Sequence, residues 1–108
     1  MGDGSMPIHI VVKNRSTEEI VDEADDINGR LERRLARMNR EQYAYLRYID
    51  PYGDTIFNRL QMEEVIPEME RLFAGSADDG SNKFFEYLLN MAKCCRDGVD
   101  LYLEFVGD

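Results

Sequence analysis

The chain has 108 residues, 44% hydrophobic and 32% charged, and its 22 acidic against 13 basic residues give a net charge of −9. This length suits a single domain, and the composition is typical of a folded protein rather than a disordered one. The charge disfavours binding to nucleic acid or anionic lipid. No apolar run approaches the roughly 20 residues of a membrane span, so we expect a cytoplasmic protein with no nucleic-acid or membrane partner.

The first five residues are typical of a vector-derived leader, because a short Gly/Ser-containing stretch precedes a second methionine, Met6. We therefore expect residues 1–5 to lie outside the fold and residues 6–108 to form one domain. The two cysteines, Cys94 and Cys95, are neighbours, and adjacent residues rarely reach the geometry that a disulfide needs. This fits a reducing compartment.

The N-terminal part of the domain predicts a strand followed by a long helix. Residues 7–13 alternate apolar and polar side chains, which is the period of a strand with one buried face. Ser16 and Glu19 have the spacing of a capping box, which predicts a helix over residues 16–38. Acidic residues come first along this helix and arginines last, an order that complements the helix dipole. Its apolar stripe would be Ile20, Ala24, Ile27, Leu31, Leu35 and Met38.

The middle of the chain predicts a β-hairpin. Residues 43–49 and 55–58 are rich in aromatic and β-branched side chains, which favour strands. Between them, Asp50, Pro51 and Gly53 occupy the positions that these residue types prefer in a tight turn.

The C-terminal half predicts two helices and a last strand. Apolar residues recur at helical spacing over 62–73, where Pro67 favours a late start or a kink, and again over 84–95, with Gly98 as the end. Residues 101–106 alternate like a strand. The resulting order is β-α-β-β-α-α-β. It predicts an α+β two-layer sandwich, with three helices on one face of a mostly antiparallel four-stranded sheet.

The turn between the predicted hairpin strands carries the densest cluster of polar side chains. Asp50 and Asp54 would flank the turn and could share a cation, while the amides of Asn58 and Gln61 could orient a ligand. The spacing lacks the order of a calcium loop, however. Aspartates in turns commonly bind backbone N–H groups, and Asn58 and Gln61 are plausible helix caps.

Familiar catalytic patterns are absent from the sequence. It has a single histidine, His9, whereas a catalytic triad or a zinc site needs several suitable partners. The sequence also contains no glycine-rich phosphate loop, no nucleophile elbow and no CxxC or HExxH motif. We expect no cofactor and no metal-ligand set, and the sequence favours a protein that is not an enzyme.

One face of the predicted sheet has the composition of a protein interface. If the alternate residues face the helices, the outer face combines tyrosine and arginine with aliphatic residues, which are enriched where proteins meet. An exposed sheet face that merely tolerates a few aromatic residues is an equal alternative. The outer-face residues would be His9, Val11, Tyr45, Arg47, Ile49, Tyr102 and Glu104.

Two segments carry a resemblance to known proteins. Residues 53–61 read GDTIFNRLQ and residues 101–108 read LYLEFVGD. The chain resembles small bacterial proteins of unknown function that combine a GDTxFNxxQ hairpin with a terminal LYLxFxGD strand. The resemblance implies a bacterial origin and transfers no catalytic residue.

The leading hypothesis is a non-catalytic protein-interaction module, of which an immunity-type inhibitor or regulator is one form. Its partner would be another protein or, in a homodimer through the outer sheet face, a second copy of the chain. The alternative is a small metal-dependent hydrolase or metal-binding protein that uses Asp50, Asp54, Asn58 and Gln61.

Overall fold

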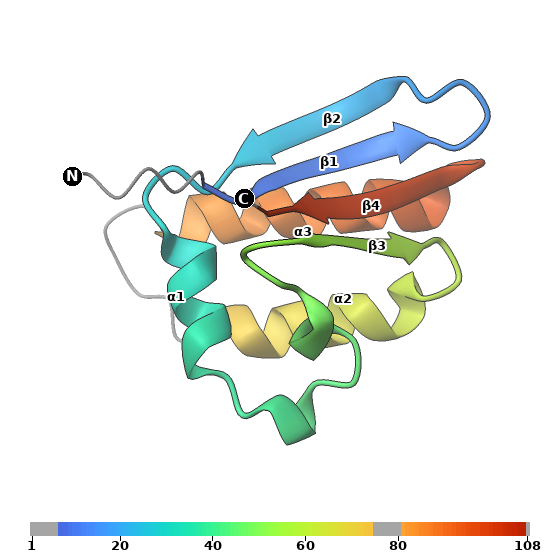
Figure 1. Ribbon diagram of the computed structural model, residues 1–108. Coiled ribbons are helices and arrows are strands. Elements are labelled where there is room, and N and C mark those ends of the chain that lie inside the picture. The colour runs from blue at the N-terminus through green and yellow to red at the C-terminus, as the bar shows by residue number, and fades with distance from the viewer. Residues whose placement is uncertain (1–6, 75–80, 108) are drawn as a thin grey trace.

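The computed structural model describes residues 7–74 and 81–107, which form an antiparallel four-stranded sheet and three α-helices (Figure 1). The predicted α+β sandwich is therefore confirmed. The predicted leader at residues 1–5 lies outside the described residues. The elements are β1 (His9–Asn14), β2 (Ile20–Asp25), α1 (Arg30–Arg37), β3 (Asp54–Asn58), α2 (Met62–Phe73), α3 (Ser81–Asp97) and β4 (Leu101–Val106).

The sheet has the strand order β2-β1-β4-β3, and every neighbouring pair is antiparallel. The last strand in sequence therefore lies inside the sheet, between the first and the third. Cross-strand pairs such as Ile10 with Phe105 and Val12 with Leu103 place one set of alternating residues on the same face. These four side chains are at most 1% exposed, so this face forms the floor of the core.

Helices α2 and α3 cover that face of the sheet (Figure 1). The rings of Phe73 in α2 and Phe85 in α3 are stacked, with centroids 4.2 Å apart, and Phe57 in β3 meets Phe105 in β4 edge-on at 6.0 Å. Arg34 in α1 donates to the backbone carbonyl of Leu72 at the end of α2. The aromatic contacts join helix to helix and strand to strand, and Arg34 holds the short α1 beside them.

The helix predicted over residues 16–38 is wrong in its first half, which forms the β1–β2 turn and strand β2. Ser16 and Glu19 belong to that turn, where Glu18 has a φ of 62° that no helix allows. Ile20 and Ile27, which belong to the predicted apolar stripe, are 50% and 77% exposed. The acidic residues therefore lie on a hairpin instead of opposing a helix dipole. The observed order is β-β-α-β-α-α-β, which differs from the predicted order only in its second and third elements.

The strand predicted over residues 43–49 is also wrong, since this segment contains a short 3₁₀ helix, Leu46–Tyr48. Tyr43, Leu46 and Ile49 recur every three residues, the period of a 3₁₀ helix, and all three are buried in the core. The predicted hairpin therefore does not exist. The turn itself forms, with the N–H of Gly53 donating to the carbonyl of Asp50.

A buried glutamate holds this irregular segment in place. Glu68 in α2 is only 6% exposed, and its carboxylate accepts hydrogen bonds from the backbone N–H groups of Ala44, Tyr45 and Leu46 at 2.9–3.1 Å. These donors have no strand partner, so the carboxylate replaces a missing sheet ladder.

A second buried carboxylate caps α1. Asp26 is 2% exposed, and its two oxygens accept the N–H groups of Leu31 and Glu32, each at 2.9 Å. Gly29 lies between cap and helix with a φ of 68°, a conformation that glycine adopts without strain. Burial raises the pKa of the Asp26 carboxyl, although the backbone N–H bonds oppose that shift.

From β3 onward, the predicted elements are confirmed. Helix α2 runs through Pro67 without interruption, and α3 ends at Asp97 with the N–H of Gly98 donating to the carbonyl of Cys94. The two segments that carry the resemblance pair as β3 and β4. At the end of this ladder, a Cβ on Gly107 would lie 2.5 Å from the carbonyl oxygen of Gly53, so only glycine fits there.

Candidate functional site

The sheet face opposite the helices is the first candidate surface. The strand registers place on it a set of residues from all four strands, and none of them belongs to the described core cluster. Glu23, Val11, Glu104 and Ile56 cross its middle in register. We call this surface the open face; it consists of His9, Val11, Lys13, Glu23, Asp25, Asp54, Ile56, Asn58, Tyr102, Glu104 and Val106.

The structure brings together only part of the predicted outer face. His9, Val11, Tyr102 and Glu104 lie on the open face as expected. The other three predicted residues belong to the irregular segment and do not lie on the sheet. Ile49 is buried in the core, the ring of Tyr45 packs edge-on against Phe57, and Arg47 lies over the ring of Tyr48.

The open face is predominantly acidic. Its four carboxylates, Glu23, Asp25, Asp54 and Glu104, outnumber its basic side chains. His9 lies between two of the carboxylates, with Nε2 3.1 Å from Glu23 and Nδ1 2.5 Å from Asp25. These contacts join β1 to the edge strand β2, and they leave Asp54 and Glu104 without a partner within the described part of the chain.

The residues of the alternative polar site are mostly engaged in local structure. Asp50 accepts the N–H of Tyr52 at 2.8 Å. Asn58 and Gln61 bond reciprocally, each side-chain oxygen accepting the other's backbone N–H, at 2.9 and 2.8 Å. Asp54 lies instead on the open face, in register with Val106. Within residues 7–74 and 81–107, no group of three or more His, Cys, Asp or Glu side chains could hold a metal ion.

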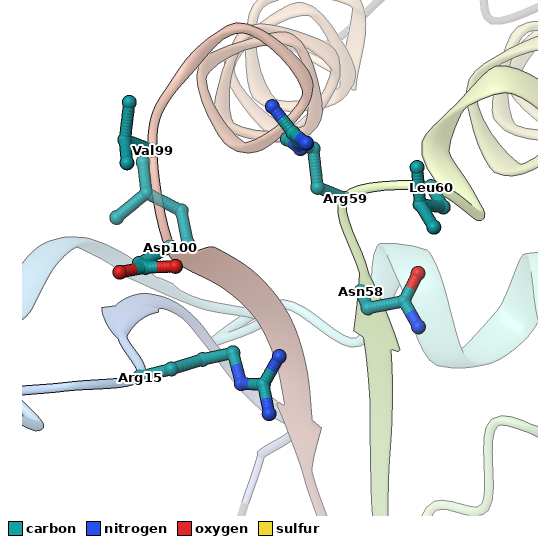
Figure 2. Close-up of a pocket in the computed structure, with 7 residues that line it drawn as sticks. Arg15, Asn58, Arg59, Leu60, Val99 and Asp100 are labelled. Atoms are coloured by element: carbon teal, nitrogen blue, oxygen red, sulfur yellow. The ribbon is translucent and has the colours of Figure 1, made fainter.

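The second candidate surface is a cavity where three turns meet at one end of the sheet, on the right in Figure 1. The turns connect β1 to β2, β3 to α2 and α3 to β4, and the cavity between them has a volume of about 220 Å³. We call it the strand-end hollow. Its lining residues, shown in Figure 2, are Arg15, Asn58, Arg59, Leu60, Val99, Asp100 and Leu101.

Hydrogen bonds between the turns fix the walls of the strand-end hollow. The backbone N–H of Arg15 donates to the carbonyl of Asp100 at 2.7 Å, and the hydroxyl of Ser16 donates to the Asp100 carboxylate at 3.2 Å. The Asn14 side chain accepts the N–H groups of Ser16 and Thr17. The β1–β2 and α3–β4 turns are thus fastened to each other.

Two arginines give the hollow a different charge from the open face. Arg15 extends across β4, while Arg59 lies on the opposite wall beside the end of α3 (Figure 2). Neither side chain makes a hydrogen bond or an ion pair to any other described residue. A neighbouring depression shares Arg15 and Asn58 and is also lined by Glu18, Ile56 and Tyr102, so the hollow continues onto the open face.

The cysteines do not form a reactive site. Cys95 is buried on the core side of α3, and burial raises the pKa of its thiol to about 11. Cys94 is exposed and lies near the C-terminal end of α3. The buried, protonated thiol of Cys95 is therefore not a nucleophile.

Sequence reasoning missed Arg15 and Arg59, because nothing in a linear pattern shows that turns 40 or more residues apart will meet. It also missed the buried acids. For Glu68 a weak signal was present, since this charged residue lies at the border of the apolar stripe of α2, directly before the buried Met69. A charge in such a place needs a buried partner.

Comparison of the chain with protein-family models, curated proteins and solved structures found no match. The resemblance of the β3 and β4 segments to small bacterial proteins therefore remains a prediction. In the described part of the chain, no helix is long and apolar enough to cross a membrane.

Proposed function

We propose that this protein is a non-catalytic interaction module that binds a basic protein surface through its open face. The observation that carries the proposal is the acidic character of a sheet face that the core does not use. The side chains of Asp54 and Glu104 on this face make no bond to other described residues, so both carboxylates are available to a partner.

The composition of the open face supports recognition of a protein. Ile56 and Val106 provide apolar contact area between the carboxylates, whereas Val11 is only 3% exposed. Tyr102 adds an aromatic side chain that can both pack and hydrogen-bond. Acidic groups around such contacts accelerate association with a positively charged partner and select against acidic ones. An inhibitor or a regulator of a basic protein is consistent with this surface.

Charge favours a foreign partner over a second copy of the chain. Two open faces brought together would oppose carboxylates to carboxylates. The edge strands are also protected, because the N–H of Glu23 in β2 bonds to the Asp22 side chain and the N–H of Asn58 in β3 bonds to Gln61. Edge groups that are already satisfied pair poorly with another strand.

The proposal is tested by charge reversal on the open face. The chain and two double variants are used to capture partners from an extract of the source organism, followed by cross-linking and mass spectrometry. Asp54→Lys with Glu104→Lys should weaken binding of the captured partner by at least about tenfold. The matched control, Glu70→Lys with Glu86→Lys, adds the same charge at exposed positions on α2 and α3 and should bind like the unchanged protein.

Two further readouts sharpen this test. Affinity for the captured partner should fall as salt is added, because exposed charges are screened beyond about 10 Å at 0.1 M ionic strength. A partner that binds both double variants equally well would rule out the open face. Light scattering that shows a concentration-dependent dimer disrupted only by the open-face variant would replace the basic partner with a second copy of the chain.

A further inference from the structure

We propose that the strand-end hollow binds an aliphatic carboxylate, with the carboxylate group between Arg15 and Arg59 and the hydrocarbon part against Leu60, Val99 and Leu101. This inference does not rest on the open face binding a protein. It concerns a neighbouring surface that shares Asn58 with the open face but carries two arginines, and hydrogen bonds between the β1–β2 and α3–β4 turns fix one of its walls.

The charges in the hollow favour an anion. Arg15 and Arg59 lie on opposite walls, and neither is paired with another described residue in a chain whose net charge is −9 (Figure 2). The one carboxylate in the lining, Asp100, accepts a hydrogen bond from Ser16 and forms no ion pair with either guanidinium. Arginine offers a planar set of donors that matches a carboxylate, so both side chains are suited to this ligand.

Asn58 is a neutral polar residue of the lining. Its side-chain oxygen accepts the backbone N–H of Gln61, which orients the amide and leaves the NH₂ group to donate. Asn58 belongs to the lining of the hollow, and in Figure 2 its amide is directed away from the two arginines. A ligand carboxylate would thus be held by the two arginines, with Asn58 as a neutral part of the wall.

The remaining walls are apolar, which selects an organic anion over an inorganic one. Leu60 and Val99 are each 77% exposed, although leucine and valine at turns gain nothing from contact with water, and Leu101 lies below them at 8% exposure. The volume of about 220 Å³ is below the roughly 300–1,000 Å³ of sites for drug-sized ligands. The ligand is therefore small, with one carboxylate and a short branched chain.

This chemistry has two sources, a free short-chain carboxylic acid and the terminal carboxylate of a peptide that ends in an aliphatic residue. Three probes separate them: 4-methylpentanoate, N-acetyl-glycyl-leucine, and the same peptide with its C-terminus amidated. Inorganic sulfate serves as the anion without a hydrocarbon part. Each probe is titrated into the ¹⁵N-labelled full chain, and backbone amide shifts are followed by NMR.

At least one of the two carboxylate probes should shift amides of residues 58–60 and 99–101, with a Kd on the order of 1 mM for so small a ligand. The amidated peptide and sulfate should bind at least about tenfold more weakly, because each lacks one of the two recognised parts. Preference for the peptide acid assigns a protein C-terminus as the ligand, whereas equal binding of 4-methylpentanoate assigns the free acid. Absence of shifts in these turns with either carboxylate up to tens of millimolar would overturn the proposal, as would equal binding of sulfate.

Variants connect the shifts to the arginines. Arg15→Gln and Arg59→Gln should each weaken binding of the preferred probe at least about fivefold, while Arg37→Gln, at an exposed position on α1, should leave it unchanged. Neither hollow arginine makes a side-chain bond to another described residue, and the substitutions leave the backbone bonds in place, so thermal unfolding of these variants should match that of the unchanged protein. If both hollow variants bind the probe as the unchanged protein does, the proposed site is wrong.

Discussion

The two buried carboxylates in the described part of the chain, Asp26 and Glu68, differ in their separation in sequence from the N–H groups that they accept. Asp26 accepts N–H groups only five and six residues later, at the start of its own helix. Glu68 accepts N–H groups 22 to 24 residues earlier, in a segment that has no regular ladder. A local carboxylate completes an element that is already helical, whereas a distant one decides where an irregular segment packs. Three substitutions test whether this difference governs stability.

The largest effect is expected from Glu68→Gln. The amide keeps one acceptor but points an NH₂ group toward backbone donors, which leaves buried N–H groups without a partner. The segment that these bonds position also contributes the buried side chains Tyr43, Leu46 and Ile49. The free energy of unfolding, measured with urea, should fall by about 3 kcal/mol. Glu70→Gln, an exposed change on the same helix, should alter it by less than about 0.5 kcal/mol.

Hydrogen exchange shows whether the loss is located in the expected place. In Glu68→Gln, the amides of Ala44, Tyr45 and Leu46 should exchange faster relative to those of β1 and β4. Equal stability of the two glutamine variants would mean that the Glu68 carboxylate does not hold this segment.

A smaller, pH-dependent effect is expected from Asp26→Asn. The substitution removes one of two acceptors at the helix start and should reduce the free energy of unfolding by about 1–2 kcal/mol near pH 4. Burial raises the folded-state pKa of Asp26 above its ordinary value of 3.8. The folded protein therefore binds this proton more tightly than the unfolded chain, and raising the pH through that interval lowers the stability of the unchanged protein.

The Asp26→Asn variant lacks this titrating group. The difference in the free energy of unfolding between the unchanged protein and the variant should therefore shrink as the pH rises from 3.8 through the raised pKa, and then stay constant. Urea unfolding of both proteins across this range measures the difference. If this difference in the free energy of unfolding grew with pH instead, the N–H bonds would lower the folded-state pKa of Asp26 more than burial raises it.

The same distinction between local and distant contacts explains what the sequence could predict. From β3 onward, apolar periodicity is strong because each element buries a continuous stripe, as β4 does with Leu101, Leu103 and Phe105. Strand β2 lies at the sheet edge and contributes only Ala24 to the edge of the core, so it carries almost no alternation. Ile20 and Ala24 of β2, Ile27 in the turn that follows, and Leu31 and Leu35 of α1 happen to have the spacing of a single helical stripe.

The candidate surfaces were predictable to a similar extent. Alternation correctly placed His9 and Val11, and Tyr102 and Glu104, on one face, because all four lie on correctly predicted strands. The strand-end hollow depends on which turns meet, and that follows from the strand order β2-β1-β4-β3. Two features of the sequence distinguish a 3₁₀ segment from a strand here. Apolar residues recur every three positions, at Tyr43, Leu46 and Ile49, and the acidic Glu68 lies beside the apolar stripe of α2.

The smallest effect should come from Asn39→Ala, which completes the comparison with a cap that is both local and exposed. The Asn39 side chain accepts the N–H of Glu41 at 3.1 Å, at the start of a second 3₁₀ helix, Arg40–Gln42. Water replaces this acceptor when the side chain is removed, so the free energy of unfolding should fall by only about 0.5–1 kcal/mol. Urea unfolding under the conditions used for Glu68→Gln gives the ranking. If Asn39→Ala lowered the free energy of unfolding as much as Glu68→Gln, the contribution of an acceptor to stability would depend neither on its burial nor on its separation in sequence from the N–H groups that it accepts.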